Sequence, residues 1–423
     1  MHTLEQLRAG ELAGIRRLQL RCGLTEFPRE IFSLADSLEI LDLSGNALSS
    51  LPDDLTRLHR LRIIFCSDNQ FTELPSVLGR CPALTMIGFK ANKIAAVPGA
   101  ALPIGLRWLV LTDNRIAALP PTIGNCPRLQ KLMLAGNRLQ SLPPELAHCA
   151  NLELLRIAAN QLPGLPAWLL AMPKLSWLAF AGNPFTTAST APKMTASIAW
   201  SNLQLEHQLG EGASGVIHRA TLDGTPVAVK VFKGAMTSDG LPDNEMSACI
   251  AAGAHPNLIP VLGIIPDHPG GLHALVMPLM DPGLRNLAGP PSLDSCTRDI
   301  YEDKQRFTGA ALHGIARGIA SAAAHLHARG IMHGDLYAHN ILNCGQGRAV
   351  LGDFGAASMF DPGGDDAAAL QRIEVRAFGC LLEELLARCD EPDPQLAQLA
   401  TDCQLPAATA RPLFAQVASR LGA

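Results

Sequence analysis

Residues 38–48 read Leu-Glu-Ile-Leu-Asp-Leu-Ser-Gly-Asn-Ala-Leu, in which three leucines lead to Asn46 and a fourth follows it. The asparagine returns at a nearly constant interval, and a Leu-Pro or Val-Pro step follows most of these returns. A fixed period is typical of a solenoid, in which each coil buries its leucines only by stacking on its neighbours. The asparagine side chain can bond main-chain groups of adjacent turns, which would otherwise be buried without partners. The asparagines of the series are Asn46, Asn69, Asn92, Asn114, Asn137, Asn160 and Asn183.

The spacing Leu-x-x-Leu-x-Leu-x-x-Asn-x-Leu resembles the leucine-rich repeat family. The resemblance implies an α/β solenoid of eight coils, shaped as a horseshoe, over residues 1–185. In the first coil Cys22 takes the place of the asparagine.

The face of the repeats that carries function should be the concave one, to which strand positions two, four and six before each asparagine point. These positions are mostly apolar, and large exposed apolar patches usually mark binding surfaces. We therefore expect a protein substrate or regulator to bind there. The alternatives are docking by the linker or by the second domain, or no specific role. We call four stacked positions the concave strip: Phe65, Trp108, Val110 and Met133.

Composition excludes several classes of protein. The chain has 423 residues, of which 48% are hydrophobic and 17% charged, and its net charge of −4 argues against a nucleic-acid binder. The eleven cysteines form no Cys-x-x-Cys pair, so a zinc site is not expected. No apolar run reaches the roughly 18 residues of a membrane span, and the N-terminus lacks the pattern of a signal peptide. We expect a cytoplasmic protein that contacts no membrane; the alternative is secretion into a host without a cleaved signal.

Residues 186–201 break the period and are rich in Thr, Ser, Ala and Pro, which predicts a linker. A second domain is predicted over residues 202–423. Its two parts are expected at 202–280 and 281–423.

The second domain begins with glycines spaced Gly-x-Gly-x-x-Gly, from Gly210 to Gly215. This spacing alone is a weak signal. Here an alternating apolar stretch follows and predicts a strand that contains Lys230, and Glu245 lies in the helical stretch that comes next. Glycines allow a main chain to approach phosphates closely.

Residues 333–340 read His-Gly-Asp-Leu-Tyr-Ala-His-Asn, and Asp-Phe-Gly follows at 353–355. Together with the glycines, Lys230 and Glu245, these motifs resemble the protein kinase superfamily over residues 203–420. The resemblance implies an α+β fold of two lobes that uses ATP and Mg²⁺. Asp335 would accept the proton of the substrate hydroxyl, and Asn340 and Asp353 would hold the metal. Nucleotide binding would fall to Gly210, Gly212, Gly215, Val216, Lys230, Leu279 and Met280, with Glu245 as the ion-pair partner of Lys230.

The chain departs from the kinase pattern in its catalytic loop and activation segment. Gly334 replaces the usual arginine, and Tyr337 replaces a lysine that helps to hold the γ-phosphate. The segment from Gly355 to Glu374 is short and lacks Ala-Pro-Glu. We therefore expect activity without phosphorylation of the activation segment, in which Ser358 should be an ordinary solvated residue.

Two functions remain open from the sequence. The first is an active kinase, serine/threonine rather than tyrosine-directed, with the repeats as a recognition or regulatory arm. The second is a repeat scaffold for protein binding, with a kinase domain that is degenerate or directed at a non-protein substrate.

Overall fold

The computed structural model describes residues 2–186, 196–212, 214–234, 236–237, 239–391 and 393–422. The chain divides into two compact units, Met1–Met172 and Pro173–Ala423. The boundary lies inside the last predicted repeat. The part of this repeat from Pro173 onward therefore belongs to the same compact unit as the predicted kinase-like domain. Residues 187–195 of the predicted linker lie outside the described residues.

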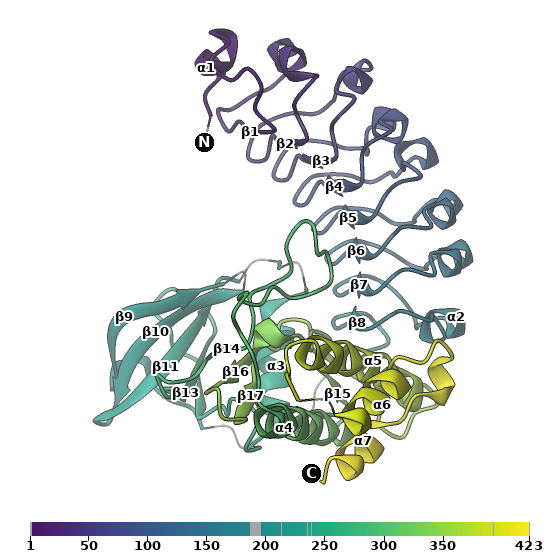
Figure 1. Ribbon diagram of the computed structural model, residues 1–423. Coiled ribbons are helices and arrows are strands. Elements are labelled where there is room, and N and C mark those ends of the chain that lie inside the picture. The colour runs from purple at the N-terminus through teal and green to yellow at the C-terminus, as the bar shows by residue number, and fades with distance from the viewer. Residues whose placement is uncertain are drawn as a thin grey trace. The chain divides into compact units, whose positions relative to one another are not determined.

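The first unit is a solenoid of short coils, which confirms the predicted leucine-rich repeat fold. Each coil contributes a three-residue strand, and neighbouring strands pair in parallel and in chain order. Figure 1 shows the strands along one side of the unit and short helical turns along the other. The strands are β1 (Arg17–Gln19), β2 (Ile40–Asp42), β3 (Ile63–Phe65), β4 (Met86–Gly88), β5 (Trp108–Val110), β6 (Lys131–Met133) and β7 (Leu154–Arg156).

The helical turns of this unit are mostly 3₁₀ helices, because each coil leaves room for only one short turn between strands. A proline stands before or at the start of most of them, where a missing N–H costs no hydrogen bond. They are α1 (Leu4–Arg8), η1 (Arg29–Leu34), η2 (Leu55–Arg57), η3 (Ser76–Arg80), η4 (Gly99–Ala101), η5 (Pro121–Asn125), η6 (Pro144–His148) and α2 (Ala167–Leu170).

The core of the solenoid is a column of central strand residues. Leu41 pairs in register with Ile64, and the column continues to Leu155 with every member fully buried. The flanking strand residues Phe65 and Trp108 are half-buried on the opposite side of the strands. At these positions the central strand residue therefore points into the core and the flanking residues point to the opposite side, as the repeat pattern predicted.

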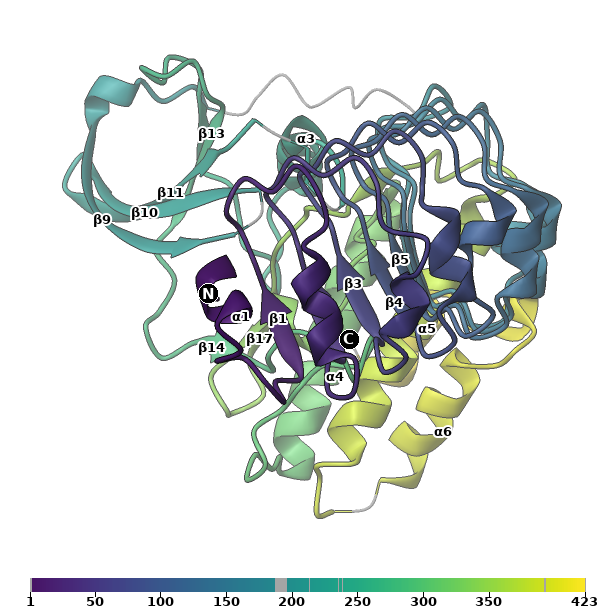
Figure 2. The same cartoon turned by 90° about the horizontal axis from the view of Figure 1, so that it is seen from above.

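The second unit begins with the coil that carries strand β8 (Trp177–Ala179), the last strand of the repeat pattern. An antiparallel sheet of five strands follows, in the order β12-β13-β11-β10-β9. Figure 2 shows β9, β10 and β11 curving together as one layer. The elements of this part are η7 (Trp200–Asn202), β9 (Leu203–Glu211), β10 (Gly215–Leu222), β11 (Thr225–Phe232), α3 (Pro242–Ala252), β12 (Gly263–Ile265) and β13 (Ala274–Pro278).

The remainder of the unit is mainly helical, as expected for the second lobe of the α+β fold. Two long helices, α4 (Gly309–Ala328) and α5 (Ala367–Leu386), are packed with α6 (Pro394–Cys403) and α7 (Phe414–Arg420). None of the described helices is long and apolar enough to cross a membrane. The short elements are β14 (Arg285–Asn286), β15 (Ile331–Met332), η8 (Ala338–Asn340), β16 (Ile341–Asn343), β17 (Ala349–Leu351), β18 (Ser358–Met359) and η9 (Ala408–Ala410).

Candidate active site

The glycine-rich segment joins β9 to β10, two antiparallel strands. Gly212 N–H donates to the Gly215 carbonyl at 2.9 Å across the turn. A Cβ at Gly215 would lie 2.5 Å from the Val231 carbonyl oxygen of β11, so the fold itself requires this glycine. A Cβ at Gly210 or Gly212 would meet only open space. Packing within the described part of the chain thus leaves the area over Gly210 and Gly212 open to a ligand.

Lys230 on β11 and Glu245 on α3 form an ion pair, as the sequence predicted. The side chains are 13% and 2% exposed, so each charge depends on the other for compensation. Burial acts to lower the pKa of Lys230, but the charges of Glu245 and Asp353 outweigh it and raise the pKa. Burial raises the pKa of Glu245 against the effect of Lys230. Asp353 influences both partners, so the three groups face a common region.

Glu374 of α5, a fully buried residue, holds the catalytic-loop segment in place. Its carboxylate accepts the N–H groups of His333 at 3.1 Å and Gly334 at 2.6 Å, and it bonds the His327 ring at 2.6 Å. Burial opposes the charge on Glu374, but the hydrogen bond from His327 helps to lower its pKa. The glutamate keeps its charge and fixes the main chain directly before Asp335.

Asp335 and Asn340 lie together at the open side of this segment. The Asn340 side-chain amide donates to the Asp335 carbonyl and to its Oδ2, both at 2.9 Å. The Gly352 N–H donates to the Asn340 carbonyl at 3.0 Å. Because Gly352 directly precedes Asp353, this bond holds the start of the Asp-Phe-Gly turn next to Asn340. Asp335 and Asn340 are partly exposed, whereas residues 336–338, which lie between them in the chain, are buried.

The chemistry of Asn340 and Asp353 fits a hard divalent cation. The Asn340 amide nitrogen is already used on Asp335, which leaves the amide oxygen as a ligand, and Asp353 adds carboxylate oxygens. Asp353 has φ of 56°, and its Oδ1 accepts the Gly355 N–H at 3.2 Å. Among the described residues no group of three or more His, Cys, Asp and Glu forms a metal site. Mg²⁺ commonly uses one or two protein groups and takes its other ligands from phosphates and water.

Leu279 and Met280 follow the end of β13, the strand next to β11. Leu275 of β13 pairs with Lys230, so the two residues continue the strand that borders the lysine. Val216 of β10 pairs with Val231 on the other side of β11. The predicted nucleotide-binding residues therefore lie on the adjacent strands β9, β10 and β11 or directly after the ends of β9 and β13.

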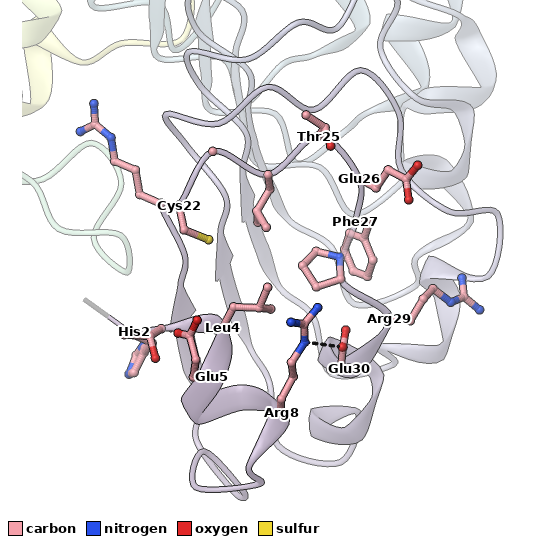
Figure 3. Close-up of a pocket in the computed structure, with 15 residues that line it drawn as sticks. His2, Leu4, Glu5, Arg8, Cys22, Thr25, Glu26, Phe27, Arg29 and Glu30 are labelled. Atoms are coloured by element: carbon pink, nitrogen blue, oxygen red, sulfur yellow. Dashed lines mark hydrogen bonds and ion pairs between the residues drawn. The ribbon is translucent and has the colours of Figure 1, made fainter.

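A cavity of about 720 Å³ opens elsewhere, at the N-terminal end of the first unit. Figure 3 shows it between α1 and the loop that leads to η1, with the Arg8–Glu30 ion pair of 2.8 Å across it. None of the predicted site residues lines this cavity.

A contact between the last repeat and the catalytic loop was not predicted from the sequence. Trp177, six positions before Asn183, belongs to the strand positions expected to face outward, and Ser358 was expected in solvent, but the two are 1% and 0% exposed. The Trp177 ring stacks on Tyr337, and the Ser358 hydroxyl accepts the N–H groups of Phe180 and Ala181, which follow β8. The sequence signal that could have indicated this contact was Tyr337 itself, an aromatic residue in the place of a lysine.

Comparison with known proteins divides the chain in the same way. Residues 203–369 match the family model of protein tyrosine and serine/threonine kinases, and residues 37–58, 104–162 and 127–185 match leucine-rich repeat models. A nodulation receptor kinase of Pisum sativum is 34% identical over 171 residues, which are 38% of this chain and 17% of that protein.

Two further relatives are similar at comparable levels. A leucine-rich repeat receptor-like protein kinase of Arabidopsis thaliana is 28% identical over 44% of this chain and 19% of its own length. A probable serine/threonine-protein kinase of Dictyostelium discoideum is 30% identical over 44% of this chain and 11% of its own length. The matched region thus covers less than a fifth of each of these three relatives.

Proposed function

Because this chain carries leucine-rich repeats followed by a protein kinase domain, we propose that it transfers the γ-phosphate of ATP to a hydroxyl group of a protein. The observation that carries the proposal is the buried Lys230–Glu245 ion pair beside Asp353. In protein kinases this pair and the metal-binding Asp must both be in place for transfer.

Each proposed catalytic residue has a distinct role. Lys230, held by Glu245, binds phosphate oxygens of ATP, and Asp335 accepts the proton of the attacking hydroxyl. Asn340 fixes the Asp335 carboxylate through its hydrogen bond and, with Asp353, supplies oxygen ligands for Mg²⁺. Bound Mg²⁺ would neutralise negative charge on the phosphates. Main-chain groups of residues 279 and 280 are offered to the adenine edge.

Serine or threonine is the substrate hydroxyl that we propose. The name of the Dictyostelium relative, a probable serine/threonine-protein kinase, supports this choice. The short segment between Gly355 and Glu374 and the presence of Tyr337 favour the second candidate, a scaffold whose kinase domain is degenerate or acts on a non-protein substrate.

The proposal assigns the repeats to recognition or regulation. Its support is the concave strip, in which Phe65 and Trp108 are half-buried rather than part of the leucine core. The Phe65 ring covers the position of Gly88, where a Cβ would lie 2.6 Å from it, and the Lys131 ammonium lies 4.3 Å from the Trp108 ring centre. Aromatic side chains of this kind are frequent anchors of protein interfaces.

Asp335→Ala in the full-length protein tests the catalytic assignment. Loss of the positioned base should lower kcat by about 10²- to 10⁴-fold, while the affinity for ATP stays nearly unchanged. The measurement is phosphate transfer from labelled ATP to a mixed panel of protein and peptide substrates, with ATP affinity read by calorimetry. Asp303→Ala, at an exposed aspartate of the same lobe, is the matched control. Equal turnover in wild type and Asp335→Ala would refute the assignment, and a wild type without transfer would favour the scaffold.

A further inference from the structure

The last coil of the repeats, residues 173–186, is bonded to α5 and to the segment between η9 and α7; we call it the terminal coil. Arg376 of α5 donates to the Lys174 carbonyl at 2.9 Å and to the Ser176 hydroxyl at 2.6 Å. Arg411 donates to the Pro173 carbonyl at 2.7 Å. Both arginines are buried, where the loss of a hydrogen-bond acceptor costs more than it would in water.

The terminal coil also holds the catalytic loop directly. The Trp177 and Tyr337 rings are parallel within 7°, with centres 4.2 Å apart, and the Trp177 Nε1–H donates to the Leu336 carbonyl at 3.1 Å. Leu336 and Tyr337 are the two residues that follow Asp335. A stacked ring and a hydrogen bond together fix both the position and the rotation of this part of the loop.

A third contact joins the terminal coil to the segment after the Asp-Phe-Gly turn. The Ser358 hydroxyl accepts the N–H groups of Phe180 at 2.9 Å and Ala181 at 3.1 Å. Ser358 lies on β18, which pairs with β15, the strand that leads into the catalytic loop. The same coil therefore binds both segments that surround Asp335.

Gly334 gives a physical reason for one departure from the kinase pattern. Its φ is 74°, and a Cβ there would lie 2.5 Å from the Ala356 carbonyl oxygen and 2.8 Å from the Leu178 carbonyl oxygen. A side chain at this position would first meet the Ala356 carbonyl and then the main chain of β8. The usual arginine is therefore incompatible with two neighbours here, the Ala356 carbonyl and the terminal coil.

We propose that Trp177 is a positioning residue for catalysis, and that the terminal coil does for this kinase domain what a phosphorylated activation segment does in other kinases. The inference rests on the proposed function. The coil contacts the buried side of the loop and leaves Asp335 and Asn340 partly exposed, which favours support of the active arrangement over obstruction of it. The Lys230–Glu245 pair is formed in the same structure in which these contacts are made.

The test compares full-length Trp177→Ala and Trp177→Phe with the wild type. Small displacements of catalytic groups can cost about 10²-fold in rate, so kcat should fall by roughly 10- to 100-fold in Trp177→Ala, while the KM for ATP changes by less than about threefold. Phenylalanine keeps a stacked ring but loses the Nε1–H, so it should restore part of the rate. Phosphatase treatment of the wild type should leave kcat unchanged.

Hydrogen exchange at Leu336–Asn340 provides a second measurement that does not depend on turnover. Exchange there should become faster in Trp177→Ala, and Trp168→Ala, a partly exposed tryptophan of α2, should change neither exchange nor kcat. If kcat in Trp177→Ala is unchanged or higher, if exchange is unchanged, or if phosphatase abolishes the rate, the proposal is wrong. If the wild type transfers no phosphate, the proposed function fails, and the exchange data alone decide whether Trp177 positions the loop.

Discussion

Glu384 on α5 is a partly buried carboxyl group whose charge is unfavourable at neutral pH. Burial and the nearby charge of Asp299 raise its pKa to about 7, although the Tyr301 hydroxyl donates to it at 3.1 Å. The unfolded chain has the ordinary glutamate pKa near 4.5. The folded state therefore binds the Glu384 proton more tightly than the unfolded state does.

This difference predicts a stability that falls as pH rises. The contribution of protonated Glu384 is fully present below about pH 4.5 and is lost as pH rises through about 7. Since each pKa unit corresponds to about 1.4 kcal/mol, the loss over the 2.5 units between the two pKa values is at most about 3.5 kcal/mol. Glu384→Gln should flatten the dependence, which urea unfolding at pH 5 and pH 8 would reveal. The exposed neighbour Glu383→Gln is the control, and parallel pH profiles for wild type and Glu384→Gln would contradict the assignment.

Single residues differed in how well the sequence revealed them. The pairing of Lys230 with Glu245 was predictable because a strand and a helix of known order in kinases follow each other directly in the chain. The burial of Ser358 was not predictable, because its partners Phe180 and Ala181 lie 178 and 177 residues away in the chain. No local pattern records a contact of that kind.

The asparagine ladder is the element that keeps successive coils in register. Asn137 donates to the Leu111 and Leu134 carbonyls at 2.9 Å and accepts the Ile116 N–H at 3.0 Å. The side chain thus bonds three main-chain groups in two coils. The repeat period predicted this ladder because every coil must solve the same hydrogen-bonding problem within its own short length.

Asn137→Ala should destabilise the repeats by leaving these buried groups without partners. Each such group costs about 1–3 kcal/mol, so the urea midpoint of the repeat unit should fall clearly. Hydrogen exchange of the β5 and β6 amides would locate the loss. Gln140→Ala, at an exposed position of the same coil, should have little effect. Equal midpoints for both variants would show that water satisfies the groups as well as the asparagine does.

At the scale of the whole molecule, the sequence predicted two kinds of architecture and the order in which they occur. Periodicity revealed the solenoid, and dispersed motifs revealed the kinase domain. The division between compact units at Met172 and Pro173 was not apparent, because the terminal coil keeps the repeat pattern in sequence while it bonds Arg376 and Arg411 of the kinase domain. The repeat pattern in the sequence predicts how a coil folds, but it does not predict which other segments pack against that coil.

Phe65→Ser with Trp108→Ser tests whether the concave strip gives the molecule its recognition function. The double variant should fold, with a thermal midpoint close to that of the wild type, because both side chains point away from the leucine core. Binding of a protein partner, read by crosslinking of the full-length chain, should weaken, since aromatic anchors contribute about 2 kcal/mol or more each. Leu109→Ser, in the fully buried column, is the folding control and should unfold the repeats.

Two outcomes would contradict this prediction in different ways. If the double variant unfolds, the direction of the strand side chains has been misinterpreted. If it folds and retains both its partners and its basal rate, the concave strip has no part in recognition or control.

The terminal coil also limits how such a protein can be recombined during evolution or in the laboratory. A cut within the predicted linker, residues 186–201, would look harmless, yet it would remove Trp177 and the carbonyl acceptors of Arg376 and Arg411 from the kinase domain. A crossover between Met172 and Pro173 would keep these groups and exchange only the coils before them. A kinase domain separated from the other repeats should therefore keep the terminal coil, and the exchange of repeats should be tolerated on the N-terminal side of that coil.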